Sequence, residues 1–275
     1  MYYDENTARA LVIEAGHRLL ESRLIARTWG NISARISEDA FIITPSGRAY
    51  DTLAPEDLVK VCIRDLSYEG DRKPSSEKGI HAQAYALRPD CGFIIHTHQF
   101  YASALCAEGK DYPFAPCAKY GLPGTKTLCA NVSACISQSP DQNSFLLEKH
   151  GALLLGKSCE DAFTLAEELE KQCREAFVSR VGNVSEDKLV AAYAAMHSSL
   201  PAYIDDFAQL VGSAAKIVGR MVRTPKSDDE EAVGMIVRKN CAAALYAKTA
   251  KPLSAGDALL QRAVYRLKYS KLKNK

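Results

Sequence analysis

The stretch "CGFIIHTHQFYASA" (residues 91–104) decides much of the fold, because an apolar run ends there in two histidines one residue apart. Successive side chains of a strand point to opposite faces of the sheet, so residues i and i+2 share a face. His96 and His98 should therefore project together, with Thr97 turned away. Two imidazoles on one face are either a first pair of metal ligands or two separately hydrogen-bonded structural histidines. The stretch alone does not decide between them.

The segments around this strand alternate between helical and strand patterns. Apolar residues at three- and four-residue spacing predict helices, whereas short β-rich runs bounded by turn residues predict strands. Helices are expected over 8–25, from Ser75 or Ser76 to before Pro89, and over 99–109, 126–137 and 158–181, the last with Ser158 and Asp161 as a capping box. Strands are expected within 28–36, 40–45, 58–63, 91–98 and 144–156. This alternation favours an α/β fold with helices on both faces of the sheet.

A second unit is expected at residues 196–275, because the strand patterns stop there. Helices are predicted over 203–221, 228–248 and 254–272, so the chain divides into a main domain at 1–195 and a helical extension. Residues 161–177 and 229–245 share an Asp, a Lys, a Cys and an Ala at an offset of 68, which suggests a degenerate partial repeat. The extension carries 14 Lys/Arg against 7 Asp/Glu, and the main domain 21 against 26. This charge split suggests that the extension docks on the main domain.

Composition excludes several classes of protein. The net charge of +2 over 275 residues gives no reason to expect nucleic acid as a partner, and no run approaches the roughly 18 apolar residues of a membrane span. The N-terminus is acidic where a signal peptide would be basic. The nine cysteines form no CxxC pair, so they are interpreted as reduced, mostly buried residues of a cytoplasmic protein and not as zinc ligands.

A third imidazole comes from His150, in "LLEKHGALLLG" directly before Gly151. Three histidines are the ligand count of a catalytic zinc site, which keeps a fourth position open. Glu77 stands in "PSSEKG" at the start of a predicted helix, where the helix dipole favours a carboxylate. Each residue alone fits a structural role, but together they favour a metal site formed by His96, His98, His150 and Glu77.

Three stretches, "WGNIS", "TPSG" and "PSS", have the composition of an anion site. They offer a side-chain amide, hydroxyl groups, and backbone N–H groups at glycines and at a helix N-terminus, which attracts anions. Each stretch also has a plain turn or cap interpretation. The candidate residues are Gly30, Asn31, Ser46, Gly47, Ser75 and Ser76. No P-loop or Rossmann fingerprint is present, so nucleotide binding is not supported.

Taken in chain order, TWGNIS (28–33), ITPSG (43–47), PSSE (74–77), H-x-H (96–98) and H-G (150–151) resemble the motifs of the class II aldolase and adducin family, nearest to its fuculose-1-phosphate aldolase type. The resemblance covers roughly residues 8–180. It implies a three-layer α/β/α sandwich, usually a homotetramer with sites at subunit interfaces.

The resemblance also implies roles for individual residues. His96, His98 and His150 would bind zinc or another divalent metal, and Glu77 would be both a resting-state ligand and the proton-transferring residue. The six anion-site residues would hold the substrate phosphate. The implied reaction cleaves a small ketose 1-phosphate to dihydroxyacetone phosphate and an aldehyde. The metal would act as a Lewis acid for the charge left when the C3–C4 bond breaks.

The sequence departs from this pattern at residues 108–124, a loop that is longer in the fuculose-phosphate type. That loop carries a tyrosine acting on the neighbouring subunit's substrate, and neither Tyr112 nor Tyr120 is assigned its role. A sugar-phosphate 4-epimerase, a dehydratase and a non-catalytic adducin-like protein stay open as alternatives. The epimerase branch typically carries Asp where Glu77 stands, and the adducin branch has lost metal ligands. The extension would cap a tetramer, close over the site or replace the neighbour's loop.

Overall fold

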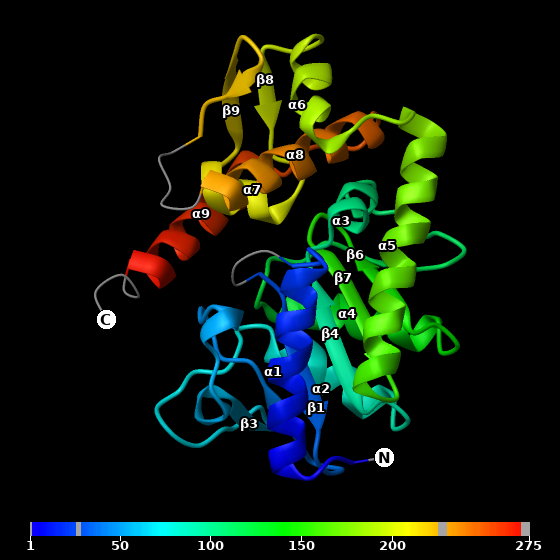
Figure 1. Cartoon of the computed structure of the whole chain (residues 1–275), viewed down its shortest axis with the longest axis vertical. Coiled ribbons are helices and arrows are strands. Elements are labelled where there is room, and N and C mark those ends of the chain that lie inside the picture. Colours follow the sequence, from blue (N-terminus) through cyan, green and yellow to red (C-terminus); the bar gives the residue numbers. More distant parts are fainter. Residues whose placement is uncertain (1, 26–28, 225–229, 271–275) are drawn as a thin grey trace.

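A seven-stranded sheet of order β3-β2-β1-β4-β7-β6-β5 forms the centre of the computed structural model, which describes residues 2–25, 29–224 and 230–270 (Figure 1). Its strands are β1 (Asn31–Arg35), β2 (Ala40–Ile43), β3 (Val59–Cys62), β4 (Phe93–Thr97), β5 (Cys117–Ala118), β6 (Ser144–Leu147) and β7 (Gly151–Gly156). Neighbouring strands are antiparallel except β5 and β6, which are parallel. The histidine-bearing strand β4 lies in the middle of the sheet.

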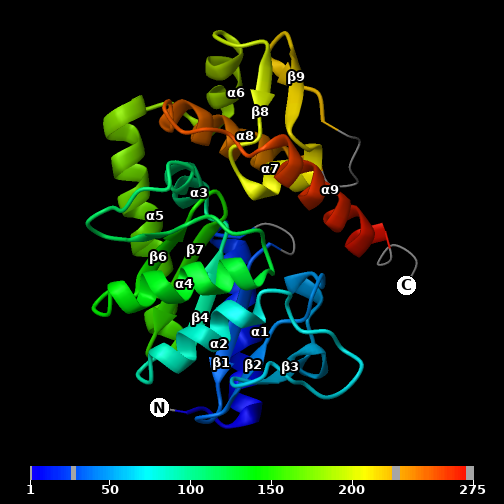
Figure 2. The same cartoon turned by 180° about the vertical axis from the view of Figure 1, so that it is seen from behind.

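Helices cover both faces of this sheet. One face packs against α1 (Glu5–Glu21) and α5 (Cys159–Val181), which lie in front of the sheet in Figure 1. The other face lies behind α2 (Lys78–Leu87) and α4 (Lys126–Gln138), which are in front in Figure 2. Two short 3-10 helices, Tyr50–Thr52 and Pro55–Asp57, connect β2 to β3, and α3 (Phe100–Cys106) follows β4. The expected three-layer α/β/α sandwich is confirmed.

Two helix starts test the predicted caps. Ser158 caps α5 as expected, because its Oγ accepts a hydrogen bond from the Asp161 N–H at 3.2 Å. The expected reciprocal bond of the capping box differs, since the Asp161 carboxylate accepts from the Lys157 N–H at 2.7 Å. The predicted cap of α2 is wrong. Its N-cap residue is Glu77, and the Ser75 hydroxyl instead accepts a hydrogen bond from the Glu77 N–H at 3.2 Å. The serine thus fixes the turn that places Glu77 at the helix start.

The C-terminal part, which we take from α6 onward, contains four helices and a small sheet among its described residues. In chain order these are α6 (Glu186–Ala194), β8 (Ser199–Pro201), α7 (Asp205–Val211), β9 (Ala214–Val218), β10 (Met221–Val222), α8 (Glu230–Tyr246) and α9 (Ala255–Ser270). The helical character is confirmed, but the helix predicted over 203–221 is wrong beyond Val211. The run Ala214–Val218 alternates exposed and buried residues, and glycines with positive φ, Gly212 and Gly219, bound it. Period-two burial is the strand pattern.

The C-terminal part and the sheet share one hydrophobic core. Helix α8 packs on α3 and α5, and a single cluster of buried side chains runs from Val12 of α1 to Ile236 of α8. Helix α6 lies before residue 195 but packs against α8 and β10. The division at residue 195 and the partial repeat stay predictions. Among the described residues no helix is long and apolar enough to span a membrane, and all nine cysteines are free, six of them buried.

Candidate metal centre and adjoining cavity

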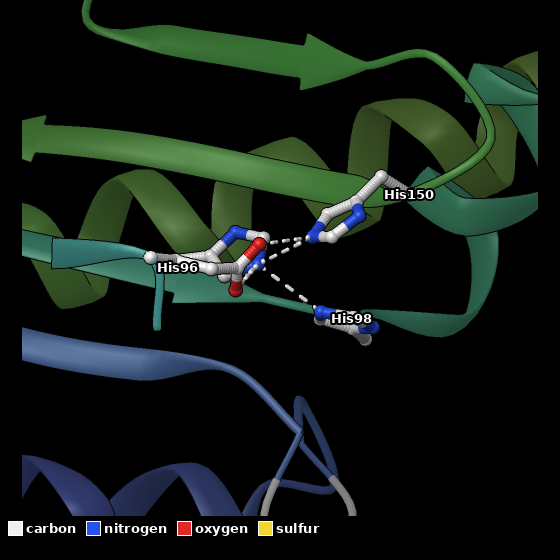
Figure 3. A group of neighbouring side chains, drawn as sticks. His96, His98 and His150 are labelled. Carbon is white, nitrogen blue, oxygen red and sulfur yellow. Dashed lines mark hydrogen bonds and ion pairs between the residues drawn. The ribbon is translucent and has the colours of Figure 1, made fainter. Parts of the chain in front are cut away.

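The pairing of β4 with β7 brings the three histidines together. His96 lies opposite Leu153 in this antiparallel pair, and Thr97 opposite Ala152, so His98 comes beside the start of β7, where His150 stands (Figure 3). The approach is close. A Cβ added to Gly151 would lie 2.3 Å from the Thr97 carbonyl oxygen, so a glycine is required after His150.

Four ligand-type atoms converge at this point. The Nε2 atom of His96 lies 3.1 Å from that of His98 and 3.0 Å from that of His150. The Glu77 carboxylate lies 3.4 Å from His96 Nε2 and 3.1 Å from His150 Nε2. A tetrahedral ion with bonds of about 2.0–2.1 Å would hold its ligand atoms about 3.3 Å apart. Four of the distances among these buried atoms are close to that spacing, and all four atoms lie within 4.8 Å of one another, which suits a metal-binding cluster.

The hydrogen bonds of the other ring nitrogens fix the tautomers. Nδ1 of His96 faces the Ala152 carbonyl at 2.8 Å, Nδ1 of His98 faces Asp206 at 2.6 Å, and Nδ1 of His150 faces Asp205 at 2.7 Å.

All three partners are acceptors, so each Nδ1 carries a hydrogen and each Nε2 of a neutral ring presents a lone pair to the cluster. Glu77 Oε1 is buried, and its one close polar neighbour among the described residues is His150 Nε2 at 3.1 Å. With all three rings neutral, three lone pairs and a carboxylate face one another, and this arrangement fits a cation.

The pKa values follow from burial and from the close contacts. Burial lowers the pKa of His98 to about 4, so this ring is neutral. Burial would also lower the pKa of His150, but the carboxylates of Glu77 and Asp205 outweigh it and raise that pKa to about 10. Burial would raise the pKa of Glu77, yet His150 and His96 hold it well below its usual range. Glu77 is therefore an anion that needs positive charge beside it, which either a proton or a metal ion supplies.

A second network holds the Glu77 carboxylate in place. The Asn31 side-chain amide donates to Glu77 Oε2 at 3.0 Å, and its oxygen accepts from His81 Nε2 at 2.5 Å. The His81 Nδ1 atom lies 2.6 Å from the Ser33 hydroxyl, and burial lowers the pKa of His81 to about 3. The amide of Asn31, expected to face a phosphate, thus donates one of its two hydrogens to Glu77. His81 supports this arrangement and is no member of the cluster.

A cavity of about 240 Å³ adjoins the cluster. The main domain contributes all six residues predicted for anion binding, Gly30, Asn31, Ser46, Gly47, Ser75 and Ser76, together with Glu77, His98 and His150. The C-terminal part forms the opposite wall with Gln209, Gln261, Val264 and Tyr265. Trp29 joins the two sides, because its ring stacks on Tyr265 with 6.4 Å between centroids, and its Nε1 donates to Gln209 at 3.4 Å.

The sequence reasoning missed the residues from the C-terminal part. Asp205 and Asp206 are buried although they are adjacent acids, and both contact histidines of the cluster. The signal in the sequence was a pair of aspartates directly before the apolar run "FAQLV". Neither unassigned tyrosine is among the residues that line the cavity. The Tyr120 hydroxyl lies 3.4 Å from Asp205, and Tyr112 bonds to Glu108 and Tyr246.

Comparison with known proteins now defines the class. The Class II Aldolase and Adducin N-terminal domain family matches residues 10–177, more than half of the chain, so the chain belongs to this family. It is 34% identical over 174 residues to the 5-deoxy-D-ribulose 1-phosphate aldolase of Bacillus thuringiensis, covering 59% of this chain and 80% of the relative. It is 30% identical over 190 residues to the 3-oxo-tetronate 4-phosphate decarboxylase of Pectobacterium atrosepticum, covering 63% and 85%.

A solved L-fuculose 1-phosphate aldolase is 28% identical, with a TM-score of 0.57 over 65% of this chain and 88% of that chain. The resemblance drawn from the sequence motifs is confirmed. The family match ends before the C-terminal part that supplies Asp205 and Asp206.

Proposed function

We propose that this protein is a divalent-metal-dependent aldolase that cleaves a small ketose 1-phosphate to dihydroxyacetone phosphate and an aldehyde. The observation that carries the proposal is the convergence of His96, His98, His150 and Glu77 beside a cavity lined with hydroxyl and amide groups. Zinc is the metal that this ligand set favours, since imidazole nitrogens and one carboxylate are borderline ligands. A bound ion would supply Lewis-acid stabilisation of negative charge on substrate oxygens.

Glu77 is the proposed proton carrier. The residue is 8% exposed, and its carboxylate lines the cavity and is oriented by the Asn31 amide. Substrate oxygens entering the cluster would displace Glu77 from it, and the freed carboxylate would move a proton to or from the carbon that loses its C–C bond. Because Glu77 is an anion, it would first accept the proton of the substrate hydroxyl whose carbon becomes the aldehyde, and would then deliver that proton to the carbon that loses the C–C bond.

The substrate phosphate is proposed to lie against Gly30, Asn31, Ser46, Gly47, Ser75 and Ser76. These residues come from three separate stretches of the chain, and all line one cavity with the start of α2 beside them. Hydroxyl and backbone N–H groups near a helix N-terminus donate hydrogen bonds of the kind that phosphate oxygens accept. Asn31 donates one amide hydrogen to Glu77, and its second amide hydrogen is the proposed donor to the phosphate.

The remaining features of the proposal come from the family and from the sequence. A homotetramer and a cytoplasmic location are expected of such an enzyme and belong to this proposal. The stacking of Trp29 on Tyr265 supports one of the three roles considered for the extension, namely that it closes over the site.

A second candidate is decarboxylation of a 3-oxo acid phosphate, which the similarity to the Pectobacterium enzyme favours. Loss of carbon dioxide from such an acid leaves the same kind of negative charge on oxygen as aldol cleavage does. It needs no group that handles the proton of a leaving aldehyde. This suits a cavity whose lining includes neither Tyr112 nor Tyr120. The 4-epimerase and the dehydratase stay as further alternatives on the same scaffold.

The test is release of dihydroxyacetone phosphate from a panel that includes 5-deoxy-D-ribulose 1-phosphate and L-fuculose 1-phosphate, with and without a chelator. We expect chelator-sensitive release that Glu77→Gln abolishes. Glu14→Gln, a change on the exposed side of α1, is the matched control and should leave release unchanged. Release of carbon dioxide from a 3-oxo acid phosphate, with no cleavage of any ketose phosphate, would establish the decarboxylase instead.

A further inference from the structure

Two adjacent aspartates of the C-terminal part contact two different histidines of the cluster. Asp205 and Asp206 begin α7, and their exposed fractions are 0% and 1%. Asp206 Oδ1 lies 2.6 Å from His98 Nδ1, and Asp205 Oδ2 lies 2.7 Å from His150 Nδ1. Buried carboxylates are costly unless they are paired and hydrogen-bonded. The burial of these two carboxylates beside the histidines therefore needs a structural or functional explanation.

Both aspartates are held by partners from other helices. Lys239 of α8, which is 1% exposed, places Nζ 2.5 Å from Asp206 Oδ2 and donates to the His98 carbonyl at 2.9 Å. Gln261 of α9 donates to Asp205 Oδ1. Helices α7, α8 and α9 thus each contribute a buried polar group to one network that ends at the two histidines.

His96 differs from the other two histidines in its support. Its Nδ1 donates to the Ala152 carbonyl, which belongs to the neighbouring strand of the central sheet. His98 and His150 lie beyond the end of the paired region of β4 and before β7, where the sheet offers them no such carbonyl partner in the described structure. Their acceptors come from the C-terminal part instead.

We propose that Asp205 and Asp206 are positioning residues that fix the tautomer and ring orientation of His150 and His98, so that the C-terminal part completes the metal site within one chain. This inference rests on the proposed function in that the cluster holds a divalent ion. A carboxylate that accepts the Nδ1–H of a ligating histidine keeps Nε2 free for the metal and raises its basicity.

The competing interpretation is that the aspartates only dock the C-terminal part. Asn240 of α8 provides the matched control, because it docks the same region without contacting a histidine. Its side-chain oxygen accepts from the N–H groups of Tyr203 and Ile204 at 2.7 and 3.3 Å, and its amide donates to the Pro201 carbonyl at 2.7 Å. Asn240→Ala should lower the midpoint of thermal unfolding and leave the metal affinity unchanged.

The experiment measures zinc affinity of the full chain by competition with a chromophoric chelator. We expect Asp205→Asn and Asp206→Asn each to weaken affinity about 10- to 100-fold, as loss of an outer carboxylate does at other metal sites. Wild-type affinity in both folded variants would overturn the inference. So would an equal loss of affinity in Asn240→Ala, because loosened docking would then explain it. A wild-type chain that binds no zinc would overturn the proposed function itself.

A second measurement needs no variant. Long-range proton–nitrogen correlation spectra of the zinc-loaded protein, labelled with ¹⁵N at histidine, report which ring nitrogen carries hydrogen. We expect hydrogen on Nδ1 and zinc on Nε2 for both His98 and His150. Zinc on Nδ1 of either ring would overturn the inference.

Discussion

Lys239 provides the sharpest test of how the C-terminal part is bound to the site. Its ammonium group is buried between Asp206 and the His98 carbonyl, at 2.5 and 2.9 Å. Lys239→Met keeps most of the apolar stem and removes the charge and its hydrogen bonds. The variant would leave Asp206 as a buried anion whose remaining side-chain partner in the described structure is the Nδ1–H of His98.

The expected loss of stability is large for one residue. Removing one partner of a buried ion pair costs about 3–5 kcal/mol, because the other charge is left uncompensated. For a chain of this size each kcal/mol lowers the midpoint of thermal unfolding by about 2–4 °C, which gives a decrease of about 6–20 °C. The measurement is thermal unfolding followed by circular dichroism, in the presence of a chelator so that metal binding does not contribute.

Two further variants decide whether this reasoning is right. Lys171→Met changes an exposed lysine of α5 at the position 68 residues earlier, and should alter stability by no more than about 0.5 kcal/mol. In Lys239→Met combined with Asp206→Asn the stranded charge is gone, so the double variant should be more stable than the sum of the two single changes predicts. Strict additivity, or a loss below about 1 kcal/mol in Lys239→Met, would refute the argument from an unpaired buried charge.

Further predictions concern the glycine, a distant carboxylate and the ion. Gly151→Ala should weaken zinc affinity in the competition assay and lower the unfolding midpoint, because its Cβ would meet the Thr97 carbonyl oxygen. The control Gly256→Ala should do neither, because its Cβ would have only a side-chain oxygen nearby, at 3.9 Å. Burial raises the pKa of Glu170 from 4.5 to about 7, so the native state favours its protonated form. Its contribution to stability should be full below pH 4.5 and lost as pH rises through 7, and Glu170→Gln should flatten urea-unfolding stability over that window. Adding zinc should raise the unfolding midpoint and a chelator should lower it, since an ion that binds only the native state stabilises it by mass action; equal midpoints would refute metal binding.

The central sheet and half of the cluster could be predicted because the relevant signals are local. Because side chains alternate along a strand, residues 96 and 98 were expected to place two imidazoles on one face, and the structure places their Nε2 atoms 3.1 Å apart. The sequence placed His150 directly before Gly151, and the structure shows that the Thr97 carbonyl oxygen requires a glycine there. Spacing and residue type carry this information within a few positions along the chain.

The small sheet of the C-terminal part was missed because its strands are too short for periodicity to separate them from helices. "SAAKIVGRM" contains alanines and a lysine that favour a helix, and only five residues of β9 show the alternation of burial. Tertiary pairing with β8 and β10 decides the conformation there. Local propensity is overruled in such segments, because packing contributes more than intrinsic preference does.

The net charge of residues 196–275 did not predict where the C-terminal part contacts the cluster, or which charge it brings there. The excess of basic residues in 196–275 suggested that positive groups would approach an acidic main domain. At the metal cluster the opposite holds, because the basic part contributes two carboxylates, Asp205 and Asp206, to two histidines. Exposed charges separated by more than about 10 Å are largely screened by salt, whereas a buried carboxylate at hydrogen-bond distance is not. A net charge therefore describes the surface of this protein, and the few buried charges decide how its site is built.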